Sequence, residues 1–133
     1  MNVAVNASGL DVLANRFIAA SDARIKTDVR LITAEEGLRW IARVRPRLYR
    51  KNGGWESGFF AQDWQAAGFN ENLILAEDPE MPERQNGASG PPGKRWEVIQ
   101  GAPEAYLAAA LGAALDMIKR LERRITGLEE MFS

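Results

Sequence analysis

The sequence predicts an α+β fold with two N-terminal helices, a small antiparallel sheet with a long loop, and a long C-terminal amphipathic helix. Apolar residues recur at helical spacing near both ends of the chain, and two short β-prone runs lie in the middle. A segment rich in proline and glycine separates these two runs. With 133 residues, the chain has the length of one domain, and we expect a single domain over residues 1–133.

The first helix is expected near residues 9–24, where Ser8 or Asp11 can act as the N-cap. Its apolar side recurs at helical spacing and consists of Leu10, Leu13, Phe17 and Ile18.

A second helix is expected to begin after Thr33, because Glu36 follows three residues later and completes a capping box. Its apolar face is expected to consist of Leu38, Ile41 and Val44. Pro46 lacks an amide hydrogen, so this helix should end or kink near residue 45.

The middle of the chain is expected to form strands around a long loop. Asn52-Gly53-Gly54 predicts a turn, and the segment after it is compatible with a short helix or with strands. NLILAE at 72–77 is expected to be a strand paired with RWEVIQ at 95–100. Residues 78–95 contain four prolines and three glycines, which predicts a mobile loop or arm, either a mobile hairpin tip or a segment ordered by a neighbouring molecule.

From Pro103 onward the sequence is strongly helical. Apolar residues alternate at spacings of four and three, as in a heptad repeat: Leu107, Leu111, Ala114, Ile118, Leu121, Ile125, Leu128 and Phe132. With Leu111 at position a, Arg124 is at g and Glu129 at e, so these two can pair between parallel chains. Two interpretations remain open: a seam between copies, or a helix packed within its own subunit with its last turns projecting to a partner.

The composition argues against common catalytic chemistry. Because the chain has no cysteine and no histidine, it lacks disulfides, thiol nucleophiles and the usual general base. The pairs Glu35-Glu36 and Glu129-Glu130 lie at expected helix ends, where capping and solvation account for them. We therefore expect no enzyme, no cofactor and no metal site.

The net charge of −1 conceals an uneven distribution: residues 1–52 carry ten Lys or Arg against five Asp or Glu, and the remainder carries seven against thirteen. Such a distribution suits contact with a polyanion or head-to-tail contact between copies. The basic residues concentrate where the second helix gives way to a loop. The residues expected to contact a partner or a DNA backbone are Arg43, Arg45, Arg47, Arg50, Lys51 and Trp55.

The order of these elements resembles that of the tail-completion and neck proteins of long-tailed bacteriophages, which connect head to tail. Gly9 and Leu10 fit the family's Gly-Leu helix start. The entry to its last helix is matched by Pro103, Tyr106, Leu107 and Ala110. The family's middle motif is not matched, because this sequence has Ser57-Gly58-Phe59 where the family has Thr-Gly-Leu.

This resemblance implies a non-catalytic subunit of a ring at the head–tail junction. We therefore expect a homo-oligomeric structural protein of the virion, assembled in the host cytoplasm beside other virion proteins. The alternative is a small protein-binding module or inhibitor that acts through its basic segment or its C-terminal helix. The sequence has no apolar run of the roughly 20 residues that span a bilayer, so no membrane partner is expected.

Overall fold

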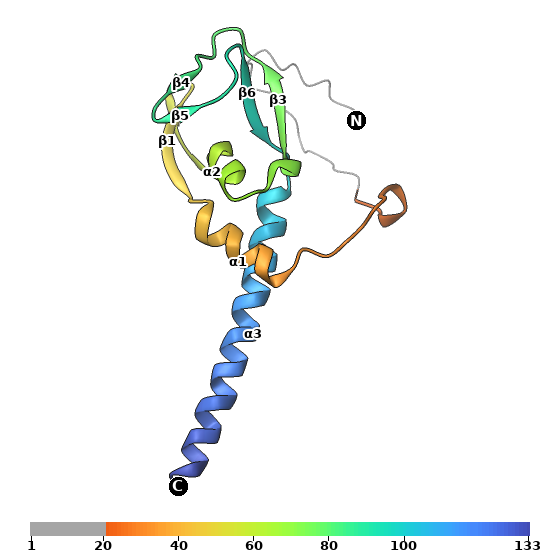
Figure 1. The fold of residues 1–133 in the computed structure, drawn as a ribbon, viewed down its shortest axis with the longest axis vertical. Helices are drawn as coiled ribbons and strands as arrows, with labels where there is room; N and C mark the ends of the chain where they lie inside the picture. Colours follow the sequence, from red (N-terminus) through yellow and green to blue (C-terminus); the bar gives the residue numbers. More distant parts are fainter. Residues whose placement is uncertain (1–20) are drawn as a thin grey trace. The chain divides into compact units, whose positions relative to one another are not determined.

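A computed structural model of the protein describes residues 21–133 (Figure 1). The chain divides into two compact units, residues 1–30 and residues 31–133. Of the helix expected at 9–24, only residues 21–24 are described, and there the chain forms a single 3₁₀ turn, η1 (Ala23–Ile25). Gly9 and Leu10 lie outside the described residues.

Helix α1 (Ala34–Arg43) begins with the predicted capping box. The Glu36 N–H donates to Thr33 Oγ1 at 3.1 Å, and the Thr33 N–H donates to Glu36 Oε1 at 3.0 Å. The helix ends at Arg43, with Val44 as its C-cap. The predicted end near residue 45 is confirmed to within two residues.

The predicted apolar face of α1 is wrong in part. Gly37 and Trp40 are buried together with Val44, whereas Ile41 is 45% exposed and Leu38 is only half-buried. The reason is steric, because glycine at position 37 lets α1 approach another helix closely, and this contact selects the face that turns inward.

The segment that the sequence left open contains both a strand and a helix. Strands β1 (Arg47–Lys51) and β2 (Gly54–Gly58) form an antiparallel hairpin, so the loop expected after the second helix is wrong for residues 47–51. Asn52 and Gly53 turn the chain with φ of 53° and 79°, the left-handed geometry that suits a two-residue hairpin loop. Helix α2 (Ala61–Ala66) and the 3₁₀ turn η2 (Asn70–Asn72) follow.

Strand β3 (Leu73–Glu77) pairs antiparallel with β6 (Lys94–Val98), as predicted, with Leu73 opposite Val98. The segment between them is organised around a second small hairpin, β4 (Arg84–Gln85) and β5 (Ala88–Ser89). The described sheets are therefore three separate antiparallel pairs. With the long last helix, they confirm the α+β class.

Helix α3 (Ala102–Met131) begins after Gly101, whose φ is 90°, and carries Pro103 in its first turn, as predicted. Only Tyr106, Ala110 and Ala113 of this helix are buried. Every residue from 115 to 133 is exposed. Within the 31–133 unit, α3 runs past α1 and continues beyond it (Figure 1).

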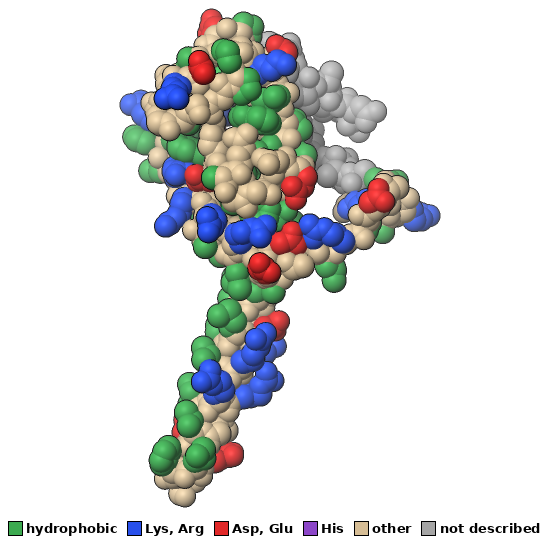
Figure 2. All heavy atoms as spheres, in the orientation of Figure 1, with side chains coloured by type: hydrophobic (Ala, Val, Ile, Leu, Met, Phe, Trp, Pro, Cys, Tyr) green, Lys and Arg blue, Asp and Glu red, His purple; other side chains and the backbone are tan. Residues whose placement is uncertain are grey.

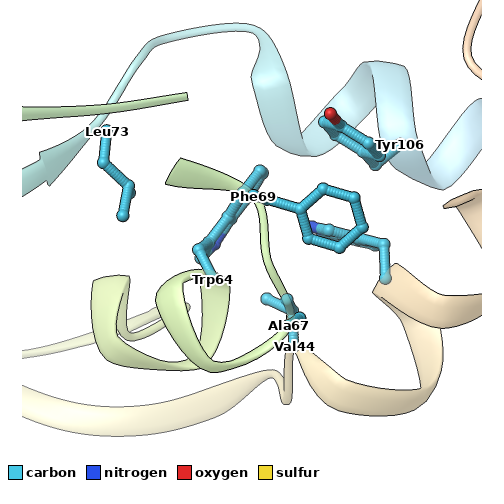
Figure 3. Packing of buried hydrophobic residues seen from close by; sticks show 7 residues of the cluster. Val44, Trp64, Ala67, Phe69, Leu73 and Tyr106 are labelled. Atoms are coloured by element: carbon cyan, nitrogen blue, oxygen red, sulfur yellow. The ribbon is translucent and has the colours of Figure 1, made fainter. Parts of the chain in front are cut away.

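One aromatic core holds the 31–133 unit together (Figure 3). Trp64 and Phe69 are fully buried, and Tyr106 reaches them from α3. The Phe69 and Tyr106 ring centroids lie 4.8 Å apart, and Trp64 meets Tyr106 edge-on at 5.5 Å. Asn72 Nδ2 donates to the Tyr106 hydroxyl at 2.9 Å, so the polar end of this ring is satisfied inside the protein.

Candidate interaction surfaces

The apolar heptad stripe of α3 is exposed along its length. We call this set the α3 seam: Leu107, Leu111, Ala114, Ile118, Leu121, Ile125, Leu128 and Phe132. Seven of the eight side chains are exposed and Ala114 is half-buried; Leu111 is 60% exposed and Phe132 is 85% exposed. Figure 2 shows hydrophobic side chains along one side of the C-terminal part of this helix. A helix with an apolar stripe on its surface normally buries that stripe against another element.

Helix α1 packs on a different face of α3. A Cβ built at Gly37 would lie 2.7 Å from the Ala110 nitrogen and 2.8 Å from the Ala109 carbonyl carbon. These residues and the buried Ala113 belong to heptad positions c, f and g, whereas the seam occupies a and d. Packing within the subunit therefore accounts for the buried part of α3 between 106 and 113, and it leaves seven of the eight seam side chains exposed.

The basic residues of 43–51 serve different purposes. Arg47 forms an ion pair with Asp63, and its guanidinium carbon lies 4.1 Å from the centre of the Phe60 ring. The Asp63 carboxylate also accepts the Arg45 backbone N–H at 3.2 Å. Arg47 thus anchors β1 to α2. No local sequence pattern indicates this contact, because Asp63 lies 16 residues away.

The remaining cationic side chains of this segment point outward. Arg50 and Trp55 face each other across the β1–β2 hairpin, with the Arg50 guanidinium carbon 5.5 Å from the Trp55 ring centre. Trp55 is 66% exposed. Arg43, Arg45 and Lys51 are also exposed. Of the six predicted contact residues, Arg47 is thus engaged within the subunit, and the other five are exposed.

A short ionic motif marks the described part of the 1–30 unit. Arg24 Nη2 donates to Asp22 Oδ2 at 2.6 Å, and the Arg24 backbone N–H donates to Asp22 Oδ1 at 2.9 Å. Both hydrogen bonds hold the pKa of the Asp22 carboxyl below its ordinary value. The bond from the Arg24 side chain has the larger effect, and the bond from the Arg24 backbone N–H has the smaller one. Among residues 21–133, no three Asp or Glu side chains are grouped in a way that could hold a metal ion.

Residues 21–74 match a family model, Peptidase_S74, described as chaperone of endosialidase, a phage tail-associated family. The matched segment runs from η1 to the start of β3, and α3 with its seam lies outside it. No curated protein matches the chain at a significant level. The match supports a phage tail-related assembly role and implies interaction with other phage proteins. No helix in the described part of the chain is long and apolar enough to cross a membrane.

Proposed function

We propose that the protein is a homo-oligomeric structural component of a phage tail whose copies associate through the α3 seam. The family match supports the tail-related part of this proposal. The exposed seam is the observation that supports oligomer formation, because seven large apolar side chains at heptad spacing are exposed to solvent. Burying one such side chain contributes about 1.5–3 kcal/mol relative to full exposure. Since these side chains are already partly shielded, each would contribute less than that.

Association through the seam is tested by measuring molecular mass in solution. The full chain should elute from size-exclusion chromatography with light scattering at a multiple of its 14.7 kDa monomer mass. Replacing Leu121 and Ile125 with Glu places charges in the apolar contact and should yield monomers with unchanged helix content. The matched control, Thr126→Glu, puts the same charge on the same helix outside the seam and should leave the mass unchanged. A parent protein that stays monomeric at high concentration would sink this proposal.

Within the virion, we place the protein at the head–tail junction, as the resemblance to tail-completion and neck proteins implies. The description of the matched family names a chaperone, which supports a different role in virion assembly, that of a protein that assists assembly and then dissociates. A neck protein remains in purified virions, whereas a dissociable chaperone is found only in the lysate. Mass spectrometry of purified particles therefore distinguishes the two positions, and labelled antibody binding at the neck would support the first.

A peptidase is the second candidate function, against our expectation of no enzyme. The name of the matched family includes a peptidase, and its segment contains both serine and lysine residues, the pair used by histidine-free serine peptidases. Ser21 is exposed where the match begins, and Lys26 follows it. Intact-mass spectrometry of purified protein over several days tests this function. Fragments that disappear in Ser21→Ala or Lys26→Ala would establish it, and a single unchanged mass would exclude self-cleavage.

The outward basic residues are proposed as a partner contact. Arg43, Arg50, Lys51 and Trp55 are exposed and belong to the matched segment, and the three cationic side chains suit an acidic protein surface or a phosphate backbone. If the protein binds DNA at low salt and loses this binding when the three residues are replaced with Ala, the result would favour contact with the phosphate backbone of DNA. If the parent protein shows no DNA binding, the contact is with protein or absent.

A further inference from the structure

We infer that the groove between α1 and α3 is a docking site for an acidic helical segment of another protein of the assembly. The groove has a volume of about 680 Å³, and all the residues that line it belong to the 31–133 unit. This inference rests on the partner contact proposed above, because Arg43 belongs to both. It goes further by naming a second site, away from the β1–β2 hairpin, and the chemistry of the partner that this site takes.

Part of the groove is apolar. Leu38 of α1 is half-buried, and Ala113 and Met117 lie one turn apart on α3. Met117 is 48% exposed. An unbranched methionine side chain adapts to the shape of a partner, and methionine is therefore common at binding surfaces. The groove thus offers apolar surface that a partner side chain can bury.

Three arginines line the same groove: Arg39 and Arg43 of α1, and Arg120 of α3. None of the three takes part in an ion pair within residues 21–133. The guanidinium carbon of Arg39 lies 4.7 Å from the centre of the Phe69 ring, and Arg39 Nε is buried with no hydrogen-bond partner among the described residues. A guanidinium that is partly removed from water and has no anionic partner favours contact with a carboxylate.

Two acids, Glu35 and Asp116, also line the groove. They precede Arg39 and Arg120 by one helical turn, which is the spacing of ion pairs on a helix, but neither pair forms in the described part of the chain. Exposed pairs at this spacing are weak, so they do not prevent the arginines from binding a partner carboxylate. With three arginines against two acids, the groove has a net positive charge.

The spacing of the arginines favours a helical partner. Arg39 and Arg43 are four residues apart on α1, so their side chains lie one turn apart on the same side of the helix. A partner helix with acids at the same spacing can place one carboxylate against each guanidinium, and such contacts are often bidentate. Its apolar side chains then bury against the apolar part of the groove.

Nucleic acid fits the groove less well than protein does. A phosphate backbone has no apolar side chain to place against Leu38 and Met117, and the two acids of the groove repel it. The family match, which implies interaction with other phage proteins, also favours a protein partner.

The groove is separate from the α3 seam. Ala113 and Arg120 occupy heptad position c and Met117 occupies position g, whereas the seam consists of positions a and d. Substitutions in one surface therefore leave the residues of the other unchanged, and the two surfaces can be tested one at a time.

Binding of a synthetic peptide to the full chain tests this inference. The probe is a fluorescein-labelled amphipathic helix of about 15 residues, built on alanine, with leucines along one side and glutamates one turn apart beside them. The matched peptide has glutamine at each glutamate position. In fluorescence anisotropy at low salt, the glutamate peptide should bind at least about 10-fold more tightly than the glutamine peptide. Equal affinity for the two peptides, or no binding of the glutamate peptide, would overturn the inference.

Single arginine substitutions locate the bound peptide. Arg120→Gln and Arg39→Gln should each weaken binding of the glutamate peptide by about 10-fold, because each removes one carboxylate contact. The matched control, Arg123→Gln, removes the same charge from the same helix outside the groove and should leave the affinity unchanged. Equal weakening by the control would reveal a diffuse charge attraction and refute the groove as the site.

Circular dichroism checks that each variant keeps the helix content and Tm of the parent, because Arg39 also packs on Phe69. Arg120 is exposed on α3, so Arg120→Gln decides the outcome if Arg39→Gln does not fold.

Three other results would each identify a different contact and overturn the inference. If Arg50→Gln weakens peptide binding and Arg120→Gln does not, the partner binds the β1–β2 hairpin, and the partner contact of the proposed function stands without the groove. If duplex DNA displaces the peptide and loses affinity in Arg120→Gln, the groove binds phosphate. If Arg120→Gln lowers the molecular mass of the parent oligomer in light scattering, the groove binds another copy of this chain.

Discussion

Replacing Gly37 with Ala should destabilise the protein, although alanine is the better helix former. The new Cβ would lie 2.7 Å from the Ala110 nitrogen and 2.8 Å from the Ala109 carbonyl carbon. Ordinary contacts between such atoms are about 3.5–4.0 Å. Both atoms belong to the backbone of α3, so no side-chain rotation relieves the overlap. Helices α1 and α3 must therefore separate.

Two opposing effects set the magnitude. Alanine in place of glycine inside a helix stabilises by about 0.8–1 kcal/mol. Overpacking costs about 1–3 kcal/mol and occasionally more, and here the contact is with backbone, so we expect a cost at or above the upper end. Separating the helices also loosens Trp40 and Tyr106, which stack with ring centroids 6.2 Å apart. The net effect should be a loss of about 2 kcal/mol or more in the free energy of unfolding.

Thermal unfolding followed by circular dichroism measures this effect, at one fixed protein concentration because association shifts the midpoint. Gly37→Ala should lower Tm by at least about 4 °C. Gly112→Ala is the matched control, since a Cβ there meets nothing within 4 Å, and it should raise Tm by a few degrees. If the two variants raise Tm equally, the close contact between α1 and α3 does not exist and the reasoning is refuted.

Three further predictions concern local contacts. Thr33→Ala removes the N-cap of α1 and should lower the free energy of unfolding by about 1 kcal/mol in urea denaturation, whereas Thr33→Ser should be nearly neutral. Asp63→Asn weakens the half-exposed ion pair with Arg47 and should cost about 1 kcal/mol at low salt, and the difference from the parent should shrink in 1 M NaCl. In an NMR pH series, the Asp22 carboxyl should titrate below its ordinary pKa, and in Arg24→Gln its pKa should return toward the ordinary value. Because the pKa is lowered, the pairing with Arg24 is present at neutral pH and is lost as the pH falls through the lowered pKa. An ordinary pKa in the parent would show that the pair does not form in solution.

The sequence by itself determined those elements whose signals are local. Thr33 and Glu36 mark the start of α1 because the two partners of a capping box lie within one turn. Asn52-Gly53 marks a turn because its backbone geometry is strained for most other residues, although the hairpin that this turn closes was not predicted. The β3–β6 pair and the long last helix follow from β-propensity and from heptad spacing in the same way.

Only the tertiary structure decided which faces are used, because burial depends on residues distant in the chain. Leu38, Ile41 and Val44 look like the inner face of α1 from their spacing, but with the close approach at Gly37 only Val44 of these three is buried, together with Trp40. From the sequence, Arg47 looks like part of a basic surface, but in the structure it forms an ion pair with Asp63 within the subunit. The heptad pattern in α3 predicts an apolar stripe on either interpretation, within a subunit or between copies. Helix α1 packs on another face of α3, and this leaves the seam exposed.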